Sequence, residues 1–189
     1  MTRSLLVAAF ALAFLTVPAS AQSLDDYSNP AAADQLPLDA QTRRVSTDAL
    51  QSTLYELVAL QHSTHQAHWN VVGQNFYELH DLLGEIYNEI FPYIDMIAER
   101  KRALGVAADA DPGRTAQNAD LPAYPMGLQQ DYDVPKQLSS QFYTVVQRVE
   151  DRIQTVGDAG DLSTQDALID ISRALELHLY KLRSLQLGE

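Results

Sequence analysis

The sequence predicts an all-α fold: a bundle of four long helices arranged as two hairpins joined by one long crossover connection. Four stretches repeat their apolar residues every three or four positions, the period of a helix with one buried face. Glycine-containing turns separate the first stretch from the second and the third from the fourth. Residues 107–134 contain prolines and small polar residues without apolar periodicity. We therefore expect this segment to be the crossover connection.

The first 21 residues have the features of a secretory signal peptide. Arg3 supplies a positive charge, an apolar run follows from Leu5 to Val17, and Ala19-Ser20-Ala21 forms a small-residue cleavage site. The apolar run is shorter than the roughly 20 residues of a membrane span. We expect export to the periplasm or the cell exterior, without membrane insertion after cleavage. An uncleaved N-terminal anchor is the alternative.

Residues 22–44 are predicted to be a flexible acidic tail, because they are rich in Ala, Asp, Pro and Ser and lack an apolar period. The bundle domain is expected to occupy residues 45–189. Its first helix should begin at a cap near Ser46 or Thr47 and end before Gly73.

The second helix is expected over residues 75–104, with a kink at Pro92, which removes one backbone hydrogen bond. The crossover should contain a short helix near residues 126–130. The third helix is expected over residues 135–156, with proline in its first turn. The fourth should run to about Leu187 from an N-cap at Ser163.

The composition favours metal ions over nucleic acid as ligands. The formal net charge is −12, and lysine occurs only at positions 101, 136 and 181. Such a balance repels DNA phosphates and anionic membranes and attracts cations. Without cysteine, disulfides and thiolate ligands are excluded, so a metal could be held only by His, Asp or Glu.

Four of the five histidines lie between positions 62 and 80, and a pair of carboxylates, Asp95 and Glu99, follows at helical i, i+4 spacing. Both carboxylates share one helix face. His80 lies on nearly the same side of the predicted helix as Asp95, but about 22 Å away along its axis. One chain therefore cannot bring His80 and this pair onto one ion. An antiparallel second copy of the helix would do so and would create two identical sites per dimer.

At these residues the chain resembles the Dps family of mini-ferritins, over roughly residues 45–187. The resemblance implies a ferritin-like bundle assembled as a hollow dodecamer, with ferroxidase sites at the two-fold axes between subunits. The resemblance rests on Gln66-Ala67-His68-Trp69-Asn70-Val71-Val72-Gly73, Asn75-Phe76, Leu79-His80, the run from Asp95 to Arg100, Leu104-Gly105 and Leu179-Tyr180.

Carried over position by position, the resemblance implies that His68 and His80 ligate iron from one subunit. Asp95 and Glu99 would be the carboxylates of the partner. Trp69 would be an electron donor that limits radical damage, or else a packed interface aromatic. Asp166 would line a pore through which iron enters, or else act only at a helix N-terminus.

Two positions depart from the family pattern. Gly84 stands where the family usually has an aspartate one turn after the second histidine, and His65 stands where a lysine is usual. One interpretation is that His65 joins the ligands and makes a nitrogen-richer site that binds iron differently and tolerates zinc. The alternative is that Gly84 leaves one iron position weak while His65 only lines the pocket.

The function implied is that of a ferroxidase and iron-storage protein. It would oxidise Fe²⁺, preferably with hydrogen peroxide rather than oxygen, and store the ferric mineral, protecting against oxidative stress. The alternative is a metal-sequestering or structural cage without oxidase activity. DNA binding is not expected from an exported chain without a basic tail. A larger ferritin is disfavoured because no Glu-x-x-His pair occurs.

Overall fold

The computed structural model describes residue 35 and residues 38–186. The predicted signal peptide and most of the predicted tail lie outside these residues. The described chain forms five helices and two very short strands. They are α2 (Ala40–Asn70), β1 (Val71–Val72), α3 (Phe76–Ala103), α4 (Pro112–Asn118), β2 (Gln129–Gln130), α5 (Val134–Ala159) and α6 (Leu162–Ser184).

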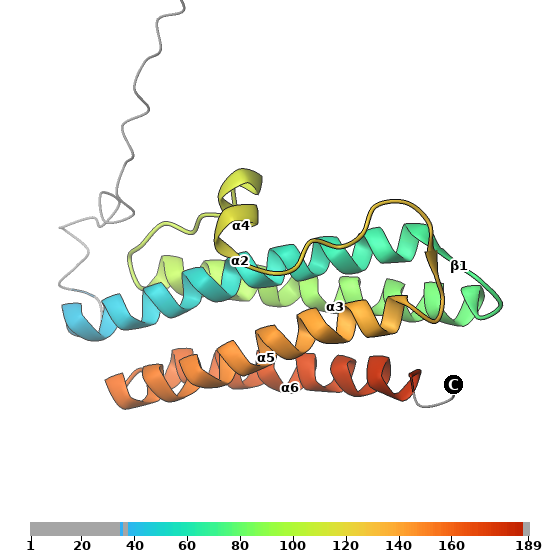
Figure 1. Cartoon of the computed structure of the whole chain (residues 1–189). Coiled ribbons are helices and arrows are strands. Elements are labelled where there is room, and N and C mark those ends of the chain that lie inside the picture. The colour runs from blue at the N-terminus through green and yellow to red at the C-terminus, as the bar shows by residue number, and fades with distance from the viewer. Residues whose placement is uncertain (1–34, 36–37, 187–189) are drawn as a thin grey trace, which may run out of the picture.

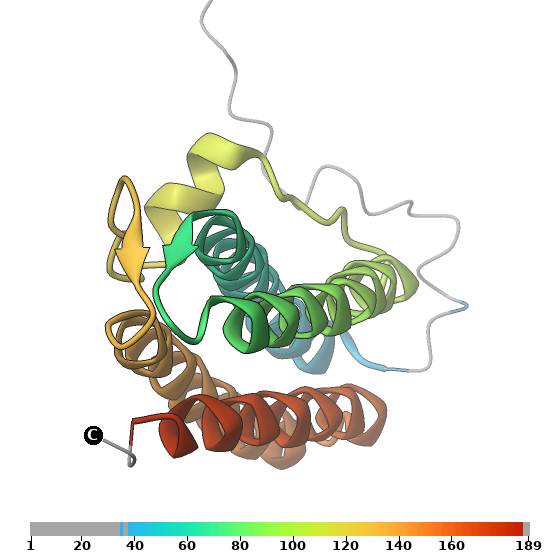
Figure 2. The same ribbon diagram turned by 90° about the vertical axis from the view of Figure 1, so that its right-hand side faces the viewer.

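Two helical hairpins make up the bundle (Figures 1 and 2). Helices α2 and α3 form one hairpin, α5 and α6 form the other, and α2 also packs along α5. The connection from α3 to α5 carries α4 across the outside of α2 and returns to the far end of the bundle, where β2 pairs in parallel with β1. This confirms the predicted all-α bundle with one long crossover. No helix of the described part combines the length and apolar character needed to cross a membrane.

Helix α2 begins earlier than predicted. Its N-cap is Asp39, whose carboxylate accepts hydrogen bonds from the backbone N–H groups of Gln41 and Thr42. The Thr42 hydroxyl also donates to the carbonyl of Ala159, the last residue of α5, 3.1 Å away. Residues 40–44 are therefore helical rather than part of a tail, and the expected cap near Ser46 is wrong: Ser46 is buried inside the helix.

The short helix of the crossover lies at residues 112–118 and not at 126–130. Asp111 caps it by accepting from the backbone N–H of Arg114, and Pro112 occupies its first turn, where a missing N–H costs nothing. The predicted segment instead contains an exposed Met126 and the strand β2.

Helix α6 is capped by Asp161 rather than by the predicted Ser163. The Asp161 carboxylate accepts from the backbone N–H of Thr164 and pairs with Arg100 of α3 at 2.8 Å. Helix α3 itself continues without a break through Pro92.

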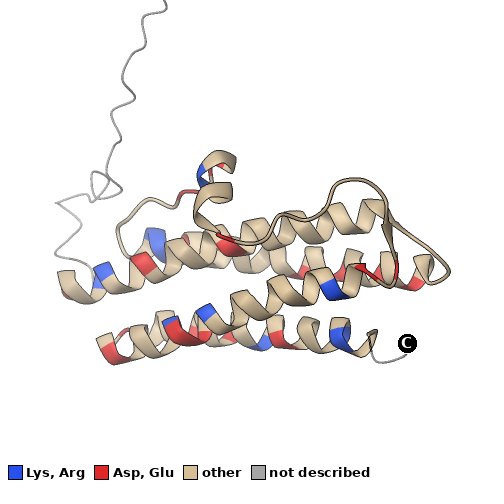
Figure 3. Cartoon of the chain, viewed as in Figure 1, with Lys and Arg blue, Asp and Glu red and all other residues tan. Residues whose placement is uncertain are grey.

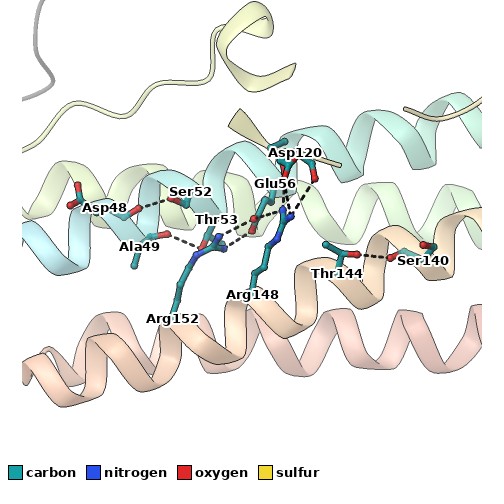
Figure 4. Close-up of polar contacts among 11 residues, drawn as sticks. Asp48, Ala49, Ser52, Thr53, Glu56, Asp120, Ser140, Thr144, Arg148 and Arg152 are labelled. Atoms are coloured by element: carbon teal, nitrogen blue, oxygen red, sulfur yellow. Dashed lines mark hydrogen bonds and ion pairs between the residues drawn. The ribbon is translucent and has the colours of Figure 1, made fainter. Parts of the chain in front are cut away.

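Apolar side chains from all four long helices fill the core, and one ionic network crosses it. Glu56 of α2 is 2% exposed and lies between Arg148 and Arg152 of α5 (Figure 4). Arg152 donates to it at 2.8 Å and Arg148 at 3.1 Å, while Arg148 also reaches Asp120 of the crossover. The network ties the two hairpins and the crossover together.

Candidate metal centre

His68 and His80 face each other where α2 turns into α3, each anchored by the other's backbone. Nδ1 of His68 lies 2.7 Å from the carbonyl oxygen of His80, and Nδ1 of His80 lies 2.9 Å from the carbonyl oxygen of His68. The His68 carbonyl is available because it belongs to the last turn of α2. Because a carbonyl only accepts, both Nδ1 atoms must carry the proton. In the neutral form of each ring, Nε2 then has a free lone pair, as in an oriented metal ligand.

The two rings are stacked, with centroids 3.7 Å apart and planes inclined by 21°. The lone pair of an imidazole nitrogen lies in the ring plane, and a bound metal sits about 2.0–2.1 Å along it. Two nearly parallel planes at this separation do not meet near the rings. His68 and His80 thus offer one nitrogen to each of two neighbouring positions, rather than two nitrogens to one ion.

His65 lies one turn earlier on α2, in an aromatic cluster. Its ring centroid is 4.1 Å from that of Tyr87, 4.1 Å from that of Trp69 and 6.2 Å from that of His68. Burial, followed by repulsion from His68 and His62, holds the pKa of His65 below its usual value. The ring is therefore kept neutral, the form in which its nitrogens can ligate.

Gly84 lies on α3 directly beside His68. A Cβ atom at this position would be 3.4 Å from Cε1 and 3.6 Å from Nδ1 of the His68 ring, an ordinary contact distance. A longer side chain at position 84 would therefore point at the ring. Glycine leaves this side of the histidine pair without a group from its own chain.

Asp95 and Glu99 lie near the other end of α3, exposed and without a hydrogen bond or ion pair to a described residue. Within residues 38–186, no three His, Asp or Glu side chains come close enough to hold a metal ion. One chain therefore places the rings of His68 and His80 side by side and His65 next to His68, but keeps the carboxylates apart from them.

The charges of α3 are divided along its length (Figure 3). Exposed acidic residues lie along most of the helix, from Glu78 to Glu99, whereas Arg100, Lys101 and Arg102 occupy its last turn. Acidic groups near the start of a helix and basic groups near its end also suit the helix dipole. The histidine end of α3 is thus the end that attracts cations.

A cleft of about 580 Å³ opens beside His65 on the joint surface of α2 and α3. At its rim Trp69 is 65% and Phe91 is 63% exposed, which is unusual for large apolar side chains. The cleft is lined by Val58, Gln61, His62, His65, Gln66, Trp69, Phe91 and Ile94.

Tyr87 and Phe91 are site residues that the sequence analysis missed. A helical signal for them exists: positions 80, 84, 87, 91 and 95 are spaced by three or four and therefore lie on one face of α3. That face meets the histidine-bearing side of α2.

Asp166, the expected pore residue, is exposed on α6 and has no ion pair with a described residue. His178 is 1% exposed in the bundle and takes no part in the cluster around His68.

Comparison with known proteins agrees with this architecture. Residues 47–187 match the ferritin-like domain family. DNA protection during starvation protein 2 of Deinococcus radiodurans is 36% identical over 139 residues, which cover 74% of this chain and 57% of that protein. The fine tangled pili major subunit of Haemophilus ducreyi is 38% identical over 90 residues, 48% of each protein. The chain thus spans only about half the length of these two relatives.

Solved structures extend the likeness over most of the bundle. The crystal structure of Dps92 from Deinococcus radiodurans superimposes with a TM-score of 0.75 at 34% identity, covering 77% of this chain and 87% of that one. DpsC from Streptomyces coelicolor gives 0.76 at 27% identity, covering 79% and 87%. With the helices, the crossover and the histidine pair in place, the chain belongs to the Dps family of ferritin-like proteins.

Proposed function

We propose that the protein binds Fe²⁺ between two copies of the chain, oxidises it with hydrogen peroxide, and stores the ferric product. The observation that carries the proposal is the reciprocal anchoring of His68 and His80, which leaves two oriented Nε2 lone pairs with no carboxylate of the described chain grouped with them. Nitrogen and carboxylate ligands suit Fe²⁺ and Fe³⁺, and neither is oxidised as a thiolate would be.

A second copy of α3, antiparallel to the first, would supply the missing oxygen ligands. In this arrangement Asp95 and Glu99 of one copy face His68 and His80 of the other, and each dimer has two sites. The cleft beside His65 and the exposed Trp69 support this surface of α2 and α3 as the contact between two copies, because a second copy would cover these apolar groups.

The chemistry needs two electrons for each molecule of peroxide. Two Fe²⁺ ions supply one electron each, and with two protons the products are two Fe³⁺ ions and two water molecules. Two adjacent nitrogen positions favour such a paired oxidation, since neither iron then releases a free hydroxyl radical. Trp69, next to the ligand His68, would serve as a reserve electron donor.

The ferric product would be stored in a hollow dodecamer, with Asp166 lining the pore through which iron enters. We further propose that the protein is exported, with cleavage after Ala21, and that it does not bind DNA. Cell fractionation with mass determination of the mature N-terminus tests export. A gel-shift titration with linear DNA at low salt tests the absence of DNA binding.

A metal-sequestering cage without oxidase activity is the second candidate, and Gly84 is the observation that favours it. Because Gly84 supplies no carboxylate, the second of the two proposed metal positions has one ligand fewer from its own chain. Such a cage would bind Fe²⁺ without oxidising it, or would bind zinc, which has no redox chemistry.

The first test is to add Fe²⁺ to the purified protein without oxygen, then hydrogen peroxide, and to follow ferric absorbance and spin-trapped radicals. Fast oxidation at about two irons per peroxide with few radicals supports the ferroxidase. Binding of Fe²⁺ with oxidation no faster than in buffer supports the sequestering cage instead.

A mixing experiment tests the shared site directly. One variant carries His68→Gln and His80→Gln, and the other carries Asp95→Asn and Glu99→Gln. Each is expected to be inactive alone. Refolding the two together at equal amounts should restore about a quarter of the unmodified activity, because half of random dimers are mixed and each has one intact site. A mixture as inactive as its components would rule out a site shared between copies.

A further inference from the structure

His65 differs from the other two histidines of the cluster in how its ring is held. His68 and His80 are fixed by hydrogen bonds from Nδ1 to a carbonyl oxygen. The His65 ring has no hydrogen bond to any residue of the described chain; its contacts are with aromatic rings. Since a ligating histidine is normally oriented by a hydrogen bond at its second nitrogen, something else must orient His65 if it is to ligate.

Of the two aromatic neighbours at 4.1 Å, Tyr87 is the better restraint. Its ring is inclined to that of His65 by 24°, close to a parallel stack, whereas Trp69 is inclined by 43° and is 65% exposed. Tyr87 also belongs to the opposite helix, so it fixes His65 relative to α3 rather than only along α2.

Tyr87 touches the neighbouring ligand as well. Its ring lies edge-on to His68, with centroids 5.3 Å apart and planes at 69°. One side chain thus contacts both rings, and aromatic contacts of these two geometries are each favourable. Gly84, one turn before Tyr87, has no side chain that could restrain the neighbouring rings, which leaves this part of α3 to Tyr87.

We propose that Tyr87 is a positioning residue that holds His65 as a third nitrogen ligand next to His68, in place of the hydrogen bond that His65 lacks. The inference rests on the proposed metal site and goes beyond it by naming the residue that makes His65 competent. The stacking face of Tyr87 carries the effect; its hydroxyl group is not required.

The test is Co²⁺ titration of the purified protein, with the visible absorption bands of Co²⁺ reporting the ligand set. Tyr87→Phe keeps the ring and should bind within about twofold of the unmodified protein. Tyr87→Leu should weaken binding by about 10- to 100-fold, the usual effect of losing a residue that orients a ligand, and should change the Co²⁺ spectrum. Tyr87→Met, which fills similar space without an aromatic face, serves if the leucine variant fails to fold. Tyr143→Leu, an exposed tyrosine of α5, is the matched control and should change nothing.

A double-mutant cycle separates positioning from general packing. In a His65→Gln background, Tyr87→Leu should have no further effect on Co²⁺ affinity, because the residue through which it acts is gone. An equal loss in both backgrounds, or no loss in either, would overturn the proposal. So would a failure of the unmodified protein to bind Co²⁺.

The result does not depend on oxidation. If the protein binds Co²⁺ through His65 but does not oxidise iron, the ferroxidase proposal fails while Tyr87 keeps its role. If iron is oxidised and Tyr87→Leu binds Co²⁺ normally, the role of Tyr87 fails alone.

Discussion

Gly84 faces His68: a Cβ atom at position 84 would lie 3.4 Å from Cε1 of the His68 imidazole. No side chain from position 84 therefore contacts the His68 ring. Because the contact is at an ordinary van der Waals distance, a Cβ atom fits at position 84 without moving the histidine. The aspartate that the family pattern has at this position can therefore be introduced by mutation.

Gly84→Asp should add an oxygen ligand beside His68 and raise both the Fe²⁺ affinity and the rate of peroxide-dependent oxidation. The affinity should rise by about tenfold, because the favourable interaction of one carboxylate with the ion is partly offset by the cost of desolvating that carboxylate. Gly84→Asn has the same shape without the charge and is the control. Isothermal titration and stopped-flow absorbance measure the two quantities. Equal behaviour of the Asp and Asn variants would show that position 84 does not face the metal.

His65→Ala distinguishes a ligand from a residue that only lines the cleft. A ligand role predicts weaker metal binding and slower oxidation, because one nitrogen donor is removed from a site that already lacks a carboxylate. Metal occupancy by elemental analysis and initial oxidation rates provide the measurements. If both are unchanged, the nitrogen-rich site is ruled out, and His65 merely lines the cleft.

Glu56→Gln should destabilise the fold strongly, because it leaves the partly buried Arg148 and Arg152 facing a neutral amide (Figure 4). Removing one partner of a buried ion pair costs about 3–5 kcal/mol. A loss of about 3 kcal/mol corresponds to a fall of roughly 6–12 °C in the thermal midpoint for a chain of this size. Glu150→Gln, an exposed glutamate of α5, is the control, and an equally small shift in both variants would contradict the role of the network.

His178 should make the protein less stable in mild acid. Burial lowers its pKa below 6.5, against the opposing effect of Glu89 and Glu85 on α3, while Lys181 on α6 lowers it further. The unfolded chain then binds a proton before the folded chain does. The stability that His178 contributes is complete above about pH 6.5 and is lost as the pH falls towards its folded pKa.

The measurement is the free energy of unfolding between pH 7.5 and pH 5.0 for the unmodified protein and for His178→Gln. The slope attributable to His178 should approach at most about 1.4 kcal/mol per pH unit. Glu89→Gln should steepen it, because the Glu89 carboxylate lies 3.1 Å from Nε2 of His178 and favours the charged ring. Parallel curves for all three proteins would refute the assignment.

The sequence could predict the bundle because helical periodicity is a local property repeated over long stretches. Helix starts were predicted less well where a polar cap precedes the apolar pattern. Asp39 begins α2 before any apolar period is visible, and the hydrogen bond from Thr42 to Ala159 that secures this end is a tertiary contact. For α4, the pair Asp111-Pro112 is a readable start signal, whereas the helix predicted at 126–130 lies too far along the crossover.

The candidate site was predictable in its residue types but not in its internal arrangement. His68 and His80 could be named from spacing and resemblance, whereas their reciprocal bonds depend on the turn that joins α2 to α3. Tyr87 could have been found by following the face of α3 from His80. Its stack on His65 could not, since this depends on how closely two helices pack.

The cap at Asp39 has a practical consequence for anyone who wishes to add a tag or cargo to this protein. Helix α2 leads from Asp39 at one end of the bundle to His68 at the other, a distance of roughly 43 Å at the rise of an α-helix (Figure 1). A label joined ahead of Asp39 is therefore attached at the end of α2 away from the histidines. Fluorophores or affinity handles placed there can report on the protein while leaving the proposed metal site at the opposite end untouched.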